Sequence, residues 1–235
     1  MYFQELREAF INLQSQIRPT HVVEVGAREA AFSLQMRSLL PHSKIHAFEA
    51  NSHVYQEFYN DIVSKDISYH NLGISNNSGV GVFLLDDSKD KIDGSHSFLG
   101  KSNKVASYSR LEIEMITLDN ALSEDINDGA NFCLWIDAEG LGYQVLEGAR
   151  NVLEHTQSIF IEVEHKKFWE NQTLAPQIIE LLGTYDFHLV ARDMEFFPVQ
   201  ENYIFINPWR AKFVYDGRRS HTHLIDSKTI KYLTF

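Results

Sequence analysis

The sequence feature that most constrains the fold is an apolar run that ends in two carboxylates. Residues 132–136 read Phe-Cys-Leu-Trp-Ile, and Asp137, Glu139 and Gly140 follow directly. A continuous apolar run of this length is typical of a strand buried on both faces, as in a parallel sheet covered by helices. Apolar residues then recur at helical spacing, which predicts a helix over 141–153. Asp137 and Glu139 are therefore expected where a central strand ends, at the edge of an open α/β sheet where ligands bind.

The rest of the chain alternates between short apolar runs and amphipathic stretches. Apolar residues recur every three or four positions near the N-terminus, which predicts a helix within residues 1–18. The next segments predict strands at 21–25, 45–48 and 67–72 and helices at 31–40 and 54–63. This β-α-β-α-β order with short connections is typical of a parallel, right-handed, doubly wound sheet. Later segments predict strands at 80–85, 111–117, 158–163, 187–191 and 203–206, a helix at 174–185 and a long polar loop over 86–109.

Composition limits the partners of the chain. Its 235 residues include 21 lysines and arginines against 32 aspartates and glutamates, a net charge of −11. This charge argues against nucleic acid or an anionic membrane as the main partner. No apolar stretch approaches the roughly 20 residues that a membrane span needs, and residues 1–10 lack the apolar core of a signal peptide. The single cysteine, Cys133, cannot form an internal disulfide, and together these features favour a cytoplasmic location.

Residues 207–235 differ from the rest of the chain in charge. They contain six basic and two acidic residues, a net +4, so residues 1–206 carry −15. We therefore predict one domain over residues 1–206 and a basic C-terminal extension over 207–235. Opposite charges attract over about a Debye length, roughly 8 Å at physiological salt. The extension is expected to fold back on the acidic domain, or to contact a second subunit and so form a homo-oligomer.

The turn after the first predicted strand has the features of a small-ligand site. Gly26 follows Glu24 by two positions, and a glycine at such a turn lets a ligand approach the backbone closely. The second strand ends in Glu49, where a carboxylate can accept hydrogen bonds from both hydroxyls of a ribose. Together these features favour an adenosine cofactor. The full Gly-x-Gly-x-x-Gly fingerprint is absent, which argues against NAD or FAD.

Five segments carry motifs of a known family. Residues 24–30 resemble the family pattern D-V-G-A-N-x-G, residues 47–50 resemble A-F-E-P, and residues 117–119 resemble T-L-D. Residues 135–149 resemble K-I-D-V-E-G-x-E-x-x-V-L-x-G-A, and residues 161–165 resemble I-x-E-x-H. The chain thereby resembles the FkbM family of S-adenosylmethionine-dependent methyltransferases over about residues 20–206. The fourth segment is the most specific of the five.

The resemblance implies a fold, a cofactor and a reaction. The expected fold class is α/β: a Rossmann-like class I methyltransferase fold with a mostly parallel seven-stranded sheet, a final antiparallel hairpin and an inserted strand pair. The expected cofactor is S-adenosyl-L-methionine. The expected reaction is O-methylation of a sugar or another small hydroxylated metabolite, so that the partner is a small-molecule or glycan acceptor. The positions implied to bind the cofactor are Glu24, Gly26, Ala27, Arg28, Glu49, Ala50, Asn71, Leu72 and Asp137.

The chain departs from the family pattern at the first turn. The family asparagine is Arg28, and the second glycine is Ala30. Arg28 either pairs with the methionine carboxylate, whose geometry a guanidinium matches, or obstructs the site. Two alternatives therefore stay open. One alternative to O-methylation is that the chain is a non-catalytic binding or scaffold domain. The other is that it is a methyltransferase that acts on an amine or a phosphate-linked sugar.

Methyl transfer to a hydroxyl requires alignment of the reactants and removal of a proton. Asp137 is expected to position the acceptor, and His165 or Glu139 is expected to accept the proton. Glu164 and His165 follow the next predicted strand, 158–163, so they should lie near Asp137 at the same edge of the sheet. These side chains could instead hold a divalent metal, which is not predicted. In the polar loop, Ser95-His96-Ser97 is expected to be solvated, and closure over the cofactor is the alternative.

Overall fold

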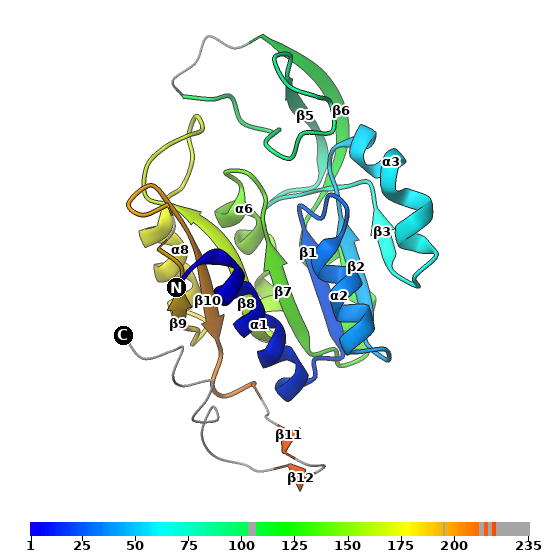
Figure 1. Ribbon diagram of the computed structural model, residues 1–235, viewed down its shortest axis with the longest axis vertical. Coiled ribbons are helices and arrows are strands. Elements are labelled where there is room, and N and C mark those ends of the chain that lie inside the picture. Colours follow the sequence, from blue (N-terminus) through cyan, green and yellow to red (C-terminus); the bar gives the residue numbers. More distant parts are fainter. Residues whose placement is uncertain (103–106, 195, 212–213, 216–217, 220–235) are drawn as a thin grey trace.

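A central sheet separates two layers of helices in the computed structural model (Figure 1). The structure describes residues 1–102, 107–194, 196–211, 214–215 and 218–219. In spatial order the sheet contains β3 (Ser68–His70), β2 (Lys44–Phe48), β1 (His21–Val25), β7 (Phe132–Ile136), β8 (Thr156–Glu164), β10 (Gln200–Ile206) and β9 (His188–Arg192). The first five strands are parallel, and β10 runs antiparallel to both β8 and β9. The prediction of a mostly parallel seven-stranded sheet with an antiparallel hairpin is confirmed.

Strand register brings three strand ends to one edge of the sheet. Val25 at the end of β1 lies beside Phe48 of β2 and Ile136 of β7. The Asp137 N–H donates to the Val25 carbonyl over 2.9 Å, which extends the pairing by one residue. The residues that follow β1, β2 and β7 therefore meet at the upper edge of the sheet in Figure 1.

The helices cover the two faces of the sheet with separate cores. One face packs against α1 (Phe3–Ile17), α2 (Ala31–Leu39) and α3 (Ser52–Val63). The other packs against α4 (Leu118–Ala121), α5 (Ser123–Asn127), α6 (Gly142–Glu147), α7 (Arg150–Glu154) and α8 (Ala175–Gly183). Strand alternation sends Trp135 toward α1 and α2, where its ring stacks 3.8 Å from that of Phe160, and Ile136 toward the opposite core.

The prediction of one continuous helix over 141–153 is wrong, because the chain breaks between α6 and α7. A Cβ at Gly148 would lie 2.1 Å from the carbonyl oxygen of Ser75, so the chain approaches another backbone at the break. Asp119 then begins the second helix by accepting hydrogen bonds from the N–H groups of Asn151 (3.0 Å) and Val152 (2.9 Å). The Thr-Leu-Asp motif thus supplies an N-terminal cap for α7.

A second, smaller sheet stands above the carboxyl edge of the first (Figure 1). It contains β4 (Gly73–Ile74), β6 (Tyr108–Ile116) and β5 (Gly79–Asp86), and the antiparallel β5–β6 pair is the predicted inserted pair. The prediction of a solvated loop is wrong for His96 and Ser97, which are both buried. None of the described helices is long and apolar enough to cross a membrane.

Only part of the C-terminal extension falls within the described residues. Asn207 is buried, and its N–H donates to the Gln157 carbonyl while its side-chain amide donates to the Tyr185 carbonyl. β11 (Val214–Tyr215) and β12 (Arg218–Arg219) pair antiparallel. The predicted contacts of residues 220–235 with the domain or with a second subunit lie outside the described residues.

Three histidines form a diagonal row across β1, β2 and β3, near the aspartate Asp125 of α5. His21 Nε2 lies 3.2 Å from Asp125 Oδ1, and His46 Nε2 lies 3.1 Å from Oδ2. The rings of His46 and His70 stack with 5.7 Å between centroids. Burial lowers the pKa of all three histidines, that of His46 to about 4, although Asp125 opposes the shift at His21 and His46.

This histidine row predicts a loss of stability in mild acid. A histidine whose folded pKa is below its unfolded value contributes stability above about pH 6.5, and that contribution is lost as the pH falls toward the folded pKa. From the shift at His46, the free energy of unfolding should fall by up to about 2 kcal/mol between pH 7 and pH 5. Urea denaturation at both pH values should show a smaller decrease in His46→Gln. The exposed control His42→Gln should behave like the parent, and an unchanged pH dependence in His46→Gln would contradict the assignment.

Candidate cofactor and catalytic site

A cavity of about 570 Å³ opens at the edge where β1, β2 and β7 end. This volume lies within the roughly 300–1,000 Å³ typical of small-molecule sites. Its walls come from α1, the turn after β1, the end of β2, the segment after β5 and the residues that follow β7. The predicted site residues that line it are Glu24, Gly26, Ala27, Arg28, Glu49, Ala50, Leu72, Asp137 and Glu139. The topology thus brings these separate segments together at one cavity.

The turn after β1 holds an unusual backbone conformation. Gly26, Arg28 and Ala30 all have positive φ, at 77°, 47° and 54°. The conformation at Ala30 costs about 1–2 kcal/mol relative to an ordinary one, which a glycine would avoid. The Ala30 side chain is fully buried and does not line the cavity, so this departure from the family pattern leaves the cavity open.

Glu24 uses its carboxylate to hold the start of α2. Its two oxygens accept hydrogen bonds from the N–H groups of Phe32 (3.3 Å) and Ser33 (2.8 Å). Burial raises the pKa of Glu24 to about 7, although these hydrogen bonds act in the opposite direction. Glu24 therefore fixes the helix that forms one wall of the cavity.

Glu49 joins the first turn to the end of β2. One carboxylate oxygen accepts from the Arg28 N–H (2.8 Å) and the other from the Asn51 N–H (2.6 Å). Burial raises the pKa of Glu49 to about 7. Asn71 supports this corner from outside the cavity, because its side-chain amide donates to the carbonyls of Glu49 and Ala50. Each oxygen of Glu49 retains a second lone pair for a ligand hydroxyl.

The Arg28 side chain lies along the cavity wall. Its Nε donates to the Ile92 carbonyl over 3.4 Å, and Nη1 lies 3.2 Å from the Glu29 carboxylate. A Cβ at Gly94 would contact the Arg28 side chain at 3.5 Å. The guanidinium is thus engaged with neighbouring segments, and the cavity keeps its volume beside it.

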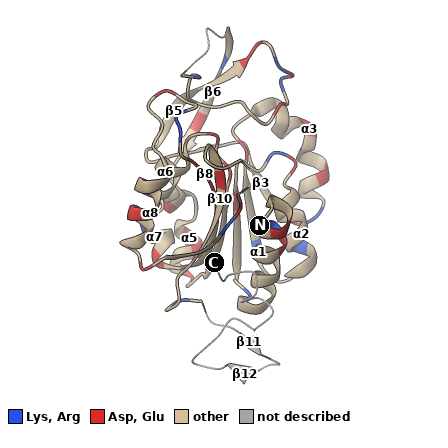
Figure 2. Cartoon of the chain, turned by 60° about the vertical axis from the view of Figure 1, so that its left-hand side comes forward, with Lys and Arg blue, Asp and Glu red and all other residues tan. Residues whose placement is uncertain are grey.

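Four carboxylates gather where β7 and β8 end, a region that is acidic in Figure 2. Asp137, Glu139 and Glu162 line the cavity, and Glu164 lies near them. Protein atoms surround Asp137 even though it borders the cavity solvent, and this desolvation raises its pKa to about 6. Burial, then the charges of Asp137 and Glu164, raise the pKa of Glu139 to about 8. Burial and the same kind of repulsion raise the pKa of Glu162 well above its usual range. A bound cation would lower these pKa values.

His165 lies on the other face of the sheet from Asp137. Strand alternation places Phe160, Glu162 and Glu164 toward α1 and α2, and His165 toward the core under α8. Its Nε2 lies within hydrogen-bond distance of Glu201 and 3.2 Å from the Tyr203 hydroxyl. His165 is not one of the described residues that line the cavity. The structure therefore does not bring His165 together with Asp137.

Several cavity residues were not predicted from the sequence. Glu162 is the most informative, because β7 and β8 pair in register and their extension puts Glu162 beside Asp137. Glu162 lies two positions before Glu164, so strand alternation places both side chains on the same face of the sheet. The sequence therefore did contain a signal for this position. Phe3, Gln4 and Arg7 of α1 also line the cavity, and no sequence signal connects them to it. No group of three or more His, Cys, Asp or Glu in the described part of the chain is arranged to hold a metal.

The residues present fit an adenosine cofactor with a cationic methionine end. Glu49 retains acceptor capacity at the end of β2, where a ribose is bound in sheets of this type. The Asp137 carboxyl forms no hydrogen bond with the described part of the chain and faces the cavity. A sulfonium or an ammonium beside Asp137 would therefore meet a carboxylate that has no hydrogen-bond partner among the described residues.

The chain is similar in fold to solved methyltransferase structures. A solved structure of a candidate tRNA (m1A22) methyltransferase from Streptococcus pneumoniae, in complex with S-adenosyl-L-methionine, aligns with a TM-score of 0.50 at 12% identity. The alignment covers 98% of this chain and 78% of that one. A magnesium protoporphyrin IX methyltransferase from Synechocystis with bound S-adenosylmethionine gives 0.48 at 8% identity, over 86% and 78% of the two chains. No curated protein matches the chain significantly.

The first of these likenesses supports the class I methyltransferase fold. The family assignment comes from sequence. The family model of the methyltransferase FkbM domain matches residues 24–189, which include the cavity-lining turn, Glu49 and the carboxylates after β7. The cofactor of the protein is S-adenosylmethionine. The chain belongs to the FkbM family of methyltransferases.

Proposed function

We propose that the protein transfers a methyl group from S-adenosylmethionine to a hydroxyl of a sugar or another small hydroxylated metabolite. The single observation that carries the proposal is the row of carboxylates, with raised pKa values, along the same cavity as Glu49. When bound, the cofactor supplies an electrophilic methyl group. The protein's own side chains must then hold the cofactor, orient the acceptor and take its proton.

The proposed roles follow from position in the cavity. Glu49 accepts hydrogen bonds from the ribose hydroxyls, and Gly26 and Ala27 present backbone to the ligand. Asp137 orients the acceptor hydroxyl. Glu139 accepts its proton at a carboxylate oxygen, because a base with a pKa near the working pH is the most effective one. His165, on the opposite face, has no part in the step.

The charge of the cavity restricts the acceptor. Acidic lining residues outnumber basic ones: Glu24, Glu29, Glu49, Asp93, Asp137, Glu139 and Glu162 against Arg7 and Arg28. Such a surface repels phosphates and carboxylates, so a phosphate-linked sugar is disfavoured. An amine acceptor is the second candidate, because the same carboxylates would attract an ammonium group. Methylation products from a panel of neutral sugars, amino sugars and sugar phosphates would separate these acceptors.

Removal of Glu49 should weaken cofactor binding. Loss of a buried charged acceptor costs about 1–3 kcal/mol, so Glu49→Ala should bind S-adenosylmethionine roughly ten- to hundredfold less tightly in isothermal titration. Glu29→Ala is the matched control, since it removes a carboxylate of the same cavity that pairs with Arg28. An analogue without ribose hydroxyls should bind the parent less tightly than S-adenosylmethionine does. Glu49→Ala should bind the analogue and S-adenosylmethionine equally tightly. Equal losses in both variants would contradict the ribose role.

The proposed base predicts a pH dependence. Glu139 acts in its deprotonated form, so kcat/KM should rise with pH and level off above about pH 8. Glu139→Gln should lower single-turnover methyl transfer by about 10²–10⁴-fold and abolish that rise, while cofactor binding survives. Asp137→Asn should lower the rate without removing the pH dependence.

His165→Gln is the matched control for these variants, because it changes a residue at the same sheet edge on the other face. It should retain near-parental rates. A large loss of rate in His165→Gln together with a parental rate in Glu139→Gln would reverse the assignment of the base.

A further inference from the structure

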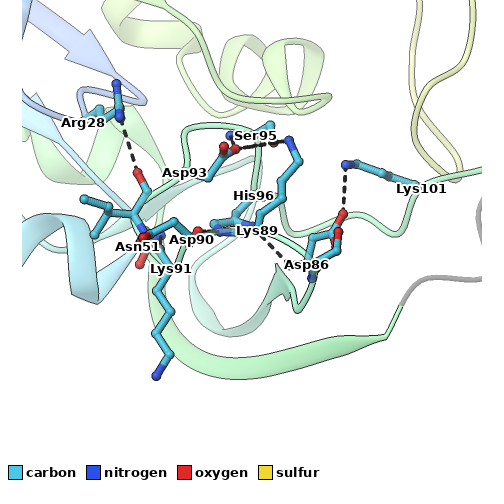
Figure 3. Close-up of polar contacts among 12 residues, drawn as sticks. Arg28, Asn51, Asp86, Lys89, Asp90, Lys91, Asp93, Ser95, His96 and Lys101 are labelled. Atoms are coloured by element: carbon cyan, nitrogen blue, oxygen red, sulfur yellow. Dashed lines mark hydrogen bonds and ion pairs between the residues drawn. The ribbon is translucent and has the colours of Figure 1, made fainter.

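The segment Asp86–Phe98 forms one wall of the cavity through Asp93, Gly94, His96, Ser97 and Phe98. Figure 3 shows the polar contacts of its part from Asp86 to His96. The segment folds around the buried His96 ring. Nδ1 of His96 accepts from the Asp86 N–H over 3.1 Å, and Nε2 donates to the Asp90 carbonyl over 2.8 Å. These two bonds span the turn between Asp86 and His96, so the segment is held as one unit.

Three hydrogen bonds connect this segment to the rest of the site. The Asn51 side-chain amide donates to the Lys91 carbonyl (2.7 Å), and Arg28 Nε donates to the Ile92 carbonyl (3.4 Å). The Ser97 hydroxyl donates to the Glu139 carbonyl over 2.6 Å. The three donor residues, Asn51, Arg28 and Ser97, all line the cavity. Figure 3 shows the first two of these hydrogen bonds.

Two of the three attachments, those of Asn51 and Arg28, converge on Glu49. The backbone N–H groups of Arg28 and Asn51 donate to its two carboxylate oxygens, while the side chains of the same two residues hold the segment. A ligand that binds Glu49 therefore contacts the group that fixes both attachment points. Opening the segment would break the Asn51 and Arg28 side-chain bonds to Lys91 and Ile92.

We propose that Arg28 and Asn51 are positioning residues that latch Asp86–Phe98 over the bound cofactor and thereby control its release. The side chain that replaces the family asparagine then holds this segment instead of binding the methionine carboxylate. The proposal rests on the cofactor site and does not depend on which acceptor is methylated. Each latch is one hydrogen bond, and loss of one should speed cofactor release about three- to tenfold.

Two variants remove the latches and keep the local structure. Asn51→Ser retains an N-cap for α3, where the Asn51 side chain accepts from the His53 N–H, but cannot reach the Lys91 carbonyl. Arg28→Met keeps the aliphatic stem and loses the donor. The control is Ser95→Ala, because the hydrogen bonds of the Ser95 hydroxyl to described residues stay within the segment, to Asp93 and Lys89. Thermal melting checks that each variant is folded.

The test measures release of S-adenosylhomocysteine by stopped-flow tryptophan fluorescence, with Trp135 in the cavity wall, and trypsin cleavage after Lys89 and Lys91, both exposed in the segment. In the parent, the ligand should slow cleavage. Both latch variants should release ligand faster and be cleaved faster, and Ser95→Ala should match the parent.

Three results would overturn the proposal. The first is parental release and cleavage rates in both latch variants. The second is cleavage of the parent that the ligand does not change. The third is an equal acceleration in Ser95→Ala, which would assign the effect to the segment's internal rigidity. Failure of the O-methylation proposal would leave these binding results unchanged, so the two proposals fail separately.

Discussion

The close contact between the turn after β1 and the end of β7 determines where the rest of the site lies. A Cβ at Gly26 would stand 1.8 Å from the carbonyl oxygen of Asp137, so glycine is required there. The Phe48 carbonyl accepts hydrogen bonds from both the Gly26 and the Ala27 N–H groups at 3.0 Å. These contacts hold three strand ends together, and they place Glu49 and Asp137 on the same cavity.

The excess of carboxylates at this cavity is unfavourable for the empty protein. Desolvation raises the pKa values of Asp137, Glu139 and Glu162, and repulsion from neighbouring carboxylates adds to the shift at Glu139 and Glu162, which means that ionised carboxylates are destabilised there. A cationic ligand would relieve that repulsion. We therefore expect S-adenosylmethionine to bind more tightly than an uncharged analogue, and we expect Glu139 to act as the base.

The sequence predicted the parts of the fold that depend on periodicity. The strand Phe132–Ile136 could be bounded because apolar residues and a following Asp-x-Glu-Gly define both its ends. The break at Gly148 could not, because it depends on contact with Ser75, far away in the chain. The same division holds for the site. Glu49 and Asp137 follow strand ends and were placed at the edge, whereas the contribution of α1 depends on how that helix crosses the sheet.

The most direct test of the account is an experimental structure of the protein with S-adenosylmethionine or S-adenosylhomocysteine. The ribose hydroxyls should lie within hydrogen-bond distance of Glu49. The sulfur should lie beside Asp137, on the face of the sheet that packs against α1 and α2. A ligand bound on the His165 face, or a ribose that does not contact Glu49, would contradict it.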